Sequence, residues 1–334
     1  MPATTSRPTP SADDVRVLLE AAVAAPSIHN TQPWRFEVDG ADVWLRADSG
    51  RQLAHVDPEG RSMLVSCGAA LLNLQVAAEH FGYEPTTRLL PVPGDPLVVA
   101  RVTLSGRDAR SGMAGALYDA IALRHTHRGP FEDRPLPQSV QSALIDAAAA
   151  EGADLRLVTD PHELGRIVQL IHAGDLERDL NPELAEEAAE WTGVPPDRMD
   201  GVPGYALGPL PDDPHAPFRD LRRGRPIEGR QQESFERTPT LGVLATRDDD
   251  RPAWIRAGAA LERVLLVATV EGVSASFANQ PLERADLRWL VRDPRAGIGY
   301  PQMLLRLGYG AAAPPIPRRP VEEVLDGADV LAEE

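Results

Sequence analysis

An apolar helix predicted over Arg61 to Phe81 restricts the fold of this chain more than any other feature. Its sequence, RSMLVSCGAALLNLQVAAEHF, is rich in alanine and leucine, and its apolar residues cover much of the circumference of a helix. A helix that is apolar on most sides has to be buried, whereas an amphipathic helix covers a surface. We therefore expect the chain to fold around this segment, with other elements packed on several of its sides.

The rest of the chain alternates predicted helices and strands in two series. Apolar residues at helical spacing predict a helix that starts after Ser11 and ends before Pro26. Asp39-Gly40, between alternating apolar residues, predicts a β-hairpin, which argues against an all-parallel sheet. We read the segment GVSASFANQP, residues 272–281, as a loop. The fold class expected from this pattern is α+β, with two halves of similar element order.

The composition argues against several classes of function. The formal net charge of −16 disfavours nucleic acid and anionic membranes as partners. The chain contains no lysine, which removes Schiff-base lysine chemistry and the lysine-bearing phosphate loop. Cys67 is the single cysteine, so neither an intrachain disulfide nor a cysteine-based zinc site is expected. Residues 1–12 read as a disordered tail without the apolar core of a signal peptide, which predicts a cytoplasmic protein.

Two kinds of polar segment are candidates for binding. The stretch APSIHNTQPW, Ala25 to Trp34, is rigid and polar but carries no ionised side chain at neutral pH. In RHTHR, alternate residues of an extended segment place Arg124, Thr126 and Arg128 on one side, as a phosphate clamp requires. A solvated turn with spare charges is the alternative interpretation. The proline-flanked pair Arg318 and Arg319 is a second basic cluster, although such pairs are often only surface residues.

Other catalytic and binding motifs are absent from the sequence. His29, His125 and His127 do not stand at the spacing of metal ligands, and no metal site is expected. The sequence has no Gly-x-Ser-x-Gly elbow of a serine hydrolase. It also has no Gly-x-Gly-x-x-Gly fingerprint after a strand, which argues against a Rossmann dinucleotide site.

Three segments together resemble the FMN-dependent nitroreductase family. APSIHNTQPWRFEV resembles the family's Ala-Pro-Ser-x-x-Asn-x-Gln-Pro-Trp signature, and RHTHRGPF its Arg-x-Ser-x-Arg phosphate motif, with Thr126 in place of serine. LRLGYGAAAPPIPRRPVEEVL resembles its C-terminal strand and basic tail. The loop precedes the phosphate motif here, whereas an ordinary member has the opposite order. This order and a proline-rich insertion are similar to the Acg-type subfamily of mycobacteria and other actinobacteria.

The resemblance implies an internally duplicated nitroreductase-like fold in which one chain mimics the family homodimer. The first half would cover residues 13–112 and the second 113–334, with an insertion at about 175–230 that acts as a lid over the flavin. Each half lacks the motif that the other carries, which implies one flavin per chain. A monomer is therefore expected, and a homodimer is also allowed.

The resemblance also implies a set of FMN-binding residues drawn from both halves. The uncharged loop would hydrogen-bond the polar edge of the flavin ring, and the arginines would hold the phosphate. The residues implied are Pro26, Ser27, Asn30 and Gln32 from the first half, and Arg124, Thr126, Arg128, Ser276, Asn279, Arg318 and Arg319 from the second. A plain loop at the start of a helix is the alternative reading for residues 276–280.

Three functions are compatible with these observations. The first is an FMN-dependent oxidoreductase that transfers hydride between NAD(P)H and a small organic acceptor. The second is a flavin-binding protein with a site covered by the lid, which sequesters FMN or serves in stress or dormancy regulation without turnover. The third, which needs no flavin, is an interaction module in which the arginine clusters are coincidental.

Overall fold

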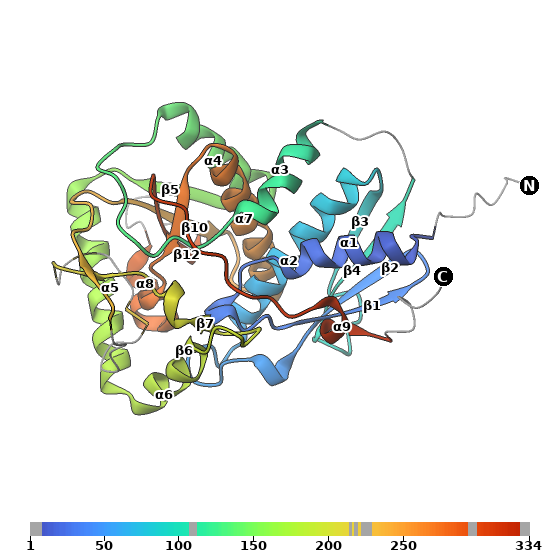
Figure 1. Cartoon of the computed structure of the whole chain (residues 1–334), viewed down its shortest axis with the longest axis horizontal. Coiled ribbons are helices and arrows are strands. Elements are labelled where there is room, and N and C mark those ends of the chain that lie inside the picture. The colour runs from blue at the N-terminus through green and yellow to red at the C-terminus, as the bar shows by residue number, and fades with distance from the viewer. Residues whose placement is uncertain are drawn as a thin grey trace, which may run out of the picture.

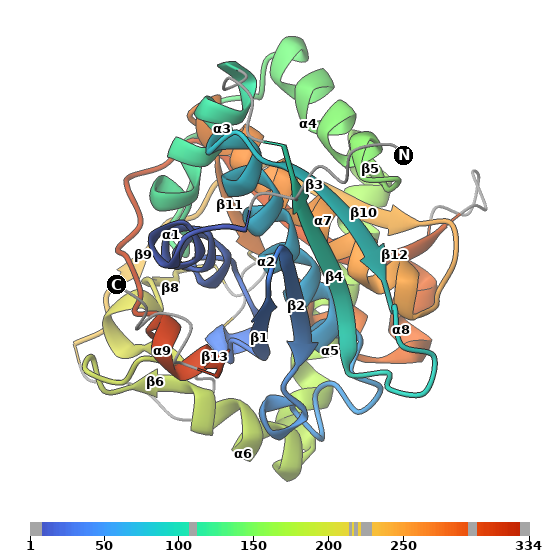
Figure 2. The same ribbon diagram turned by 90° about the vertical axis from the view of Figure 1, so that its right-hand side faces the viewer.

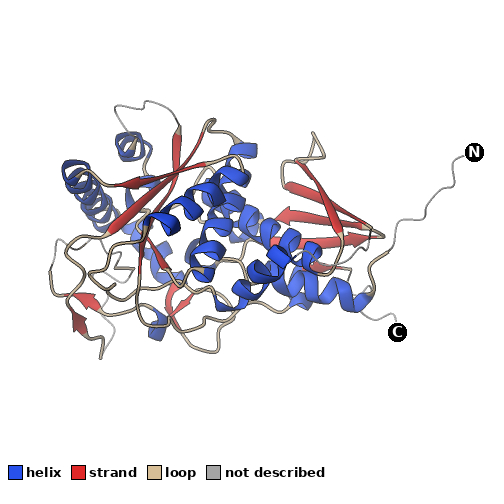
Figure 3. Cartoon of the chain, turned by 90° about the horizontal axis from the view of Figure 1, so that it is seen from above, coloured by secondary structure: helices blue, strands red, loops and turns tan. Residues whose placement is uncertain are grey.

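The computed structural model describes residues 9–106, 112–213, 216, 220–221, 229–292 and 299–327. In this part of the chain, two mainly antiparallel sheets lie on opposite sides of a central group of helices (Figure 1 and Figure 3). The molecule is thus an α+β protein, as its sequence predicts. Residues 1–8 of the predicted tail lie outside the described residues, and Ser11 caps the first helix, where its hydroxyl oxygen accepts a hydrogen bond from the Asp14 N–H.

The first half of the chain supplies one sheet and the central helix. Its elements are α1 (Ala12–Val23), β1 (Trp34–Asp39), β2 (Asp42–Ala47), α2 (Arg61–His80), β3 (Glu84–Leu89) and β4 (Val98–Ser105). The predicted hairpin is confirmed: β1 and β2 pair antiparallel around a turn in which Gly40 has a φ of 58°. Helix α2 is buried on all sides from Met63 to Leu74, which confirms its predicted central position.

The second half builds the other sheet and a larger set of helices. Its helices are α3 (Gly112–Leu123), α4 (Gln138–Ala150), α5 (Pro161–Leu180), α6 (Pro182–Trp191), α7 (Arg251–Val270), α8 (Ala285–Val291) and α9 (Val321–Val324). Its main strands are β5 (Asp154–Val158), β10 (Thr240–Thr246), β11 (Ser274–Phe277), β12 (Tyr300–Gly308) and β13 (Leu325–Asp326). Short pairs β6 (Thr192–Val194) with β7 (Val202–Pro203), and β8 (Leu210–Pro211) with β9 (Gln232–Glu233), lie between α6 and β10.

Apart from the added strand β13, the two sheets have the same strand order. The four strands of the first half read β1-β2-β4-β3 and those of the second β5-β10-β12-β11, with every adjacent pair antiparallel. The first connection differs, because β1 and β2 form a hairpin whereas α5 and α6 lie between β5 and β10. In each half, a long helix connects the second strand to the edge strand. This repetition is what a duplicated chain would produce, and the duplication itself stays an inference.

The two long helices cross where each carries a glycine. A Cβ atom on Gly68 of α2 would lie 2.0 Å from the carbonyl oxygen of Ile255, and one on Gly258 of α7 would lie 1.9 Å from that of Val65. No other residue type allows two helix backbones to approach so closely. Both glycines begin the same four letters, GAAL, at residues 68–71 and 258–261. The crossing therefore repeats in sequence as well as in structure.

The C-terminal segment joins the two halves. After β12 the chain runs back across the molecule to the first sheet, where β13 pairs parallel with β1 through Phe36 and Leu325 (Figure 2). One prediction in the second half is wrong: residues 274–277 of the segment read as a loop form the edge strand β11, paired with β12. Its four residues alternate two small polar side chains with Ala275 and Phe277, which is too short a pattern to identify from sequence.

One described helix, α2, is long and apolar enough to cross a membrane by length and composition alone. However, 83% of its most apolar window is buried inside the protein. Its composition is therefore explained by its place in the core between α1, α3 and α7.

Candidate functional site

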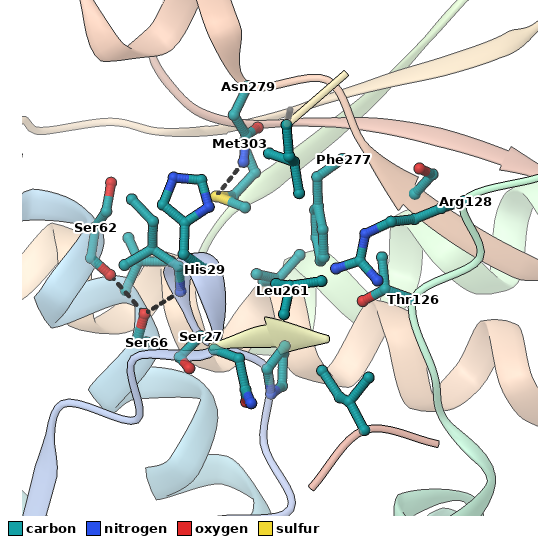
Figure 4. A pocket seen from close by; sticks show the side chains of 18 of the residues that line it. Ser27, His29, Ser62, Ser66, Thr126, Arg128, Leu261, Phe277, Asn279 and Met303 are labelled. Carbon is teal, nitrogen blue, oxygen red and sulfur yellow. Dashed lines mark hydrogen bonds between the residues drawn. The ribbon is translucent and has the colours of Figure 1, made fainter. Parts of the chain in front are cut away.

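A cavity lined by residues of both halves lies where these halves meet, and the space in it is about 1040 Å³ when the open solvent at its mouth is included. Its walls come from the loop after α1, the first turns of α2, the strand β11 and the C-terminal segment. Figure 4 shows the side chains around it, with Arg128 and Thr126 on one side and Ser62, Ser66 and Ser27 on the other.

Eight of the eleven predicted FMN-binding residues line this one cavity. They are Pro26, Ser27, Asn30, Thr126, Arg128, Ser276, Asn279 and Arg318. The first and last of these residues are separated in sequence by almost the whole described chain. It is therefore the fold that brings them together. Whether they contact a flavin stays a prediction.

The loop between α1 and β1 has an unusual backbone. His29, Asn30 and Gln32 all have positive φ angles, of 45°, 56° and 51°. Residues other than glycine adopt this region rarely, and such strain is concentrated at binding and catalytic sites. The conformation is held from inside the protein: the Ile28 N–H donates to Ser66 Oγ over 3.2 Å, and the Gln32 N–H donates to Ser27 Oγ over 3.0 Å.

Asn30 presents an acceptor without a protein donor to the cavity. Its Nδ2 donates to the carbonyl oxygens of Gly201, at 2.8 Å, and Pro317, at 3.2 Å. Its Oδ1 is buried and accepts no hydrogen bond from the described part of the chain. A buried amide oxygen without a donor is costly, so this atom is suited to accept a hydrogen bond from a ligand.

Two arginines, Arg128 and Arg318, make part of the cavity wall cationic. Arg128 Nη1 donates to the Ala206 carbonyl over 3.0 Å, and Arg318 donates to the carbonyls of Ile316 and Pro317. Burial and the neighbouring charge of Arg124 lower the pKa of Arg318 to about 9, so it stays protonated at neutral pH. Its Nε is buried without an acceptor in the described chain. An anion would relieve the repulsion and fill this bonding position.

Three predicted site residues lie behind the lining and not in it. Arg124 points away, to within 3.2 Å of Glu262, whose carboxylate is fully buried in α7. Burial raises the pKa of Glu262, and the charge of Arg124 opposes that rise. Gln32 donates to the Met199 carbonyl and accepts from the Arg319 N–H over 2.7 Å. These side chains support the cavity wall because their hydrogen-bonding capacity is directed to other parts of the protein.

The strand β11 places Ser276 and Phe277 in the cavity wall. A bridge between Thr126 and Ala275 attaches the phosphate-motif segment to this edge strand. Asn279 follows the strand, and its amide is used by the protein: Oδ1 accepts from the Leu304 N–H over 2.8 Å, and Nδ2 points to the sulfur of Met303. Residues 276 and 277 belong to β11, so the alternative interpretation of residues 276–280 as a plain loop is wrong for these two residues.

The segment predicted to act as a lid contributes residues to the cavity wall, and its role as a lid stays a prediction. The insertion predicted at about 175–230 begins in the last turns of α5 and continues through α6, and its residues 214–215, 217–219 and 222–228 lie outside the described part. Val202 and Leu221 line the cavity, and Val202 packs with Ile316 of the C-terminal segment. The lid is bonded to the strained loop, since the Gly201 N–H donates to the Asn30 carbonyl.

Several cavity residues were not identified from the sequence. His29, Arg61, Ser66 and Glu283 all line it. A signal was present for two of them, because Arg61 and Ser66 are polar residues near the start of a mostly apolar helix. No local pattern marks Glu283, which enters the site through the fold.

The histidines of the phosphate-motif segment are packed within the protein. His127 Nε2 lies 3.0 Å from the Pro130 carbonyl, and its ring stacks on Phe131 with centroids 4.8 Å apart. Burial lowers the pKa of both His125 and His127. In the described ranges, no group of three His, Cys, Asp or Glu side chains is arranged to hold a metal ion.

Comparison with known proteins identifies the family. Residues 121–309 match the model of the nitroreductase family. Two Mycobacterium tuberculosis proteins that are provisionally named NAD(P)H nitroreductases, Rv3131 and Acg, are 34% and 31% identical to this chain. The alignments cover 96% of this chain and 94% of Rv3131, and 93% of this chain and 95% of Acg.

Two solved structures are more distant. The FMN-dependent nitroreductase NfnB of Mycobacterium smegmatis, in complex with NADPH, is 16% identical over 63% of this chain and 97% of its own, with a TM-score of 0.37. An Anabaena variabilis protein titled as a nitroreductase aligns with 90% of this chain and 73% of its own, at 12% identity and a TM-score of 0.43. The assignment rests on the family model and the mycobacterial relatives. The chain belongs to the nitroreductase family.

Proposed function

We propose that this protein is an FMN-dependent oxidoreductase of the nitroreductase type and that FMN occupies the cavity between its halves. Two atoms support this proposal: the buried Oδ1 of Asn30 needs a donor, and the buried Nε of Arg318 needs an acceptor. FMN offers both kinds of group, because its ring carries an imide N–H and its phosphate carries oxygens. Bound there, the flavin would supply the hydride-transfer chemistry.

The chain's own residues would bind and orient the cofactor. Arg128 and Arg318 would hold the phosphate, with Thr126 beside them, while Ser27 and Asn30 would meet the polar edge of the ring. Gln32, Arg124 and Arg319 would keep these groups in place from behind. The lid residues Val202 and Leu221 would exclude water from this part of the cavity.

NAD(P)H is the electron donor that we propose, since the mycobacterial relatives carry that name and the M. smegmatis structure holds NADPH. The acceptor is a small organic molecule. These names favour turnover over the alternative of a flavin store with a covered site. A monomeric, cytoplasmic protein with one site per chain is part of the proposal, and neither nucleic acid nor membrane has a role in it.

The proposal is tested by the affinity for FMN and for riboflavin, which lacks the phosphate. Charge-assisted hydrogen bonds contribute roughly 1.5–3 kcal/mol each. We expect Arg128→Ala with Arg318→Ala to weaken FMN binding at least 100-fold and to leave riboflavin binding within a fewfold. Fluorescence titration of apoprotein measures both. Arg16→Ala, at an exposed ion pair with Glu322, is the matched control. Retention of full FMN affinity, or an equal loss of both ligands, would contradict the proposal.

A further inference from the structure

A fully buried carboxylate stands behind the arginines of the cavity. Glu262 lies in the middle of α7 and is 0% exposed, and its Oε1 is 3.2 Å from Nε of Arg124, which is 5% exposed. Neither residue lines the cavity. Burying such a pair is costly, because the loss of hydration can exceed the attraction between the charges. The pair therefore needs an explanation other than stability.

Packing does not require a charge at this position. The four letters GAAL that begin at the crossing glycines are followed by Leu72 in α2 and by Glu262 in α7, and both residues are fully buried. The first half thus fills the corresponding position with an apolar side chain. The carboxylate stands in the half that supplies Arg124, Arg128 and Arg318.

We propose that Glu262 is a positioning residue that withdraws Arg124 from the ligand and so sets the charge that faces the phosphate. The inference rests on the proposed function, because the phosphate in question is that of FMN. The cations of the phosphate motif and C-terminal segment that line the cavity are then Arg128 and Arg318. Their two charges match a phosphate monoester, which carries a charge of about −1.5 to −2 at neutral pH.

Contacts on two sides of Arg124 hold it away from the cavity. Its Nη2 donates to the carbonyl oxygen of Ala24 over 2.8 Å, while its Nε faces Glu262. Ala24 caps the C-terminal end of α1, where the helix dipole favours a cation. The sequence predicts Arg124 as part of the phosphate clamp, so these two contacts account for its place behind the lining.

Arg124 is still close enough to the cavity for its charge to act there. Arg318 Nη2 donates to the same Ala24 carbonyl, over 3.3 Å, so the two guanidinium groups are neighbours. Burial and then the charge of Arg124 lower the pKa of Arg318, and the carboxylate of Glu262 acts in the opposite direction. Glu262 thus offsets the positive charge beside Arg318. Without this carboxylate, the arginines would carry an excess charge that a bound anion relieves.

The experiment compares the affinities of apoprotein variants for FMN and for riboflavin by fluorescence titration. We expect Glu262→Gln to tighten FMN binding about tenfold or more, because Arg124 then places an uncompensated charge near the phosphate. Riboflavin has no phosphate, and its affinity should stay within a fewfold. A merely structural role of Glu262 would change the affinities for both ligands alike.

A second variant decides the question even if a lone buried guanidinium impairs folding. Arg124→Gln with Glu262→Gln replaces the ion pair by two neutral amides. We expect this double variant to bind FMN within a fewfold of the natural protein, because the two arginines that face the phosphate are unchanged. Glu151→Gln is the matched control: it removes the carboxylate partner of Arg263, the next residue of α7, and neither of these residues lines the cavity. This control should leave both affinities unchanged.

Two outcomes would overturn the inference. One is an FMN affinity that Glu262→Gln leaves unchanged or weakens, since the carboxylate would then not limit the charge near the phosphate. The other is a double variant that binds FMN as weakly as Arg128→Ala with Arg318→Ala, which would place Arg124 on the phosphate. A natural protein that does not bind FMN contradicts the proposed function, whereas one that binds FMN through Arg128 and Arg318 but gives either outcome contradicts only this inference.

Discussion

The ionisation of Asp57, a buried carboxylate, should affect the stability of the folded protein. It caps α2 by accepting hydrogen bonds from the N–H groups of Ser62, at 2.9 Å, and Met63, at 2.8 Å. Burial raises its pKa from 3.8 to about 6, and these two bonds only partly oppose the rise. A carboxyl group whose pKa is higher in the folded state binds its proton more tightly there. Acidification through this range therefore stabilises the fold.

We expect the stability of the natural protein to improve relative to Asp57→Asn as the pH falls from about 7 to 4. A shift of this size corresponds to about 3 kcal/mol. The amide cannot ionise, and its oxygen still accepts a hydrogen bond from the helix. Melting temperatures of both proteins, measured at half-unit pH steps, check the prediction. A difference that moves in the opposite direction would show that the Asp57 pKa is lowered by folding.

Individual site residues could be predicted from the sequence only where they belong to a motif. Eight predicted residues line the cavity because each motif fixes a local backbone shape that the fold then brings to one place. Gln32 and Arg319 belong to the same motifs but bond to each other, through the Arg319 N–H and Gln32 Oε1. A motif does not say which member faces a ligand and which faces a neighbouring segment. Glu283 lies outside every motif and could be found only from the structure.

Among the contacts between helices, the crossing of α2 and α7 should matter most for stability. We expect Gly258→Ala to destabilise the protein by about 1–3 kcal/mol, because its Cβ would lie 1.9 Å from the Val65 carbonyl oxygen. The helices would have to separate, and Val65 and Leu261, which line the cavity, would move with them. Gly165→Ala in α5 is the control, since no atom lies within 4 Å of its added methyl group.

The two glycine substitutions should change the free energy of unfolding in opposite directions. Gly165 is an exposed residue inside a helix, where alanine is favoured by up to about 1 kcal/mol. Chemical denaturation of both variants, together with FMN affinity, measures the effect on the core and on the site. Equal stability of the two variants would mean that α2 and α7 do not approach as closely as described.

Asp200 joins the predicted lid segment to the first half of the chain through Arg51. It accepts from Arg51 Nη1 over 2.7 Å and from Arg198 Nε. Burial favours a higher pKa for Asp200, but the bonds to Arg51 and Arg198 outweigh it, and the net result is a lowered pKa. Its contribution to stability is therefore present at neutral pH and is lost as the pH falls through this lowered value.

We expect Asp200→Asn to speed amide hydrogen exchange in the lid, including the Gly201 N–H that donates to the Asn30 carbonyl. Protection in β10 should be unchanged, because that strand is held by its own sheet. Asp197→Asn makes the same change of charge at an exposed residue of the same segment and should leave the lid protected. Unchanged lid exchange in Asp200→Asn would show that other contacts hold it.

The sequence predicts long elements better than short ones. The apolar pattern of α2 is repeated over enough residues to be distinctive, and the observed helix, Arg61–His80, ends one residue before the predicted end. The four residues of β11 carry too little pattern, and the two of β13 pair with a strand almost 300 positions away. Such pairing is decided by the path of the C-terminal segment, which local sequence does not encode.

In the whole molecule, the two halves have similar elements but differ at the connection that contributes to the cavity. In the first, residues 24–33 connect α1 to β1 and form the strained loop of the cavity. In the second, residues 151–153 connect α4 to β5 and leave no room for such a loop. Of the arginines that line the cavity, Arg128 and Arg318 come from the second half and its C-terminal segment, and Arg61 comes from the first half. Complementary parts therefore meet once in each chain.

This asymmetry predicts one FMN for each chain. Because β13 of the second half completes the first sheet, the two halves cannot be separated without opening that sheet. We expect a single chain to supply the whole site. Native mass spectrometry of the FMN-loaded protein should therefore show a single chain with a single flavin. Two flavins on one chain would mean that the short 151–153 connection also supports a site. A dimer with one shared flavin would mean that the cavity needs a wall that this chain does not supply.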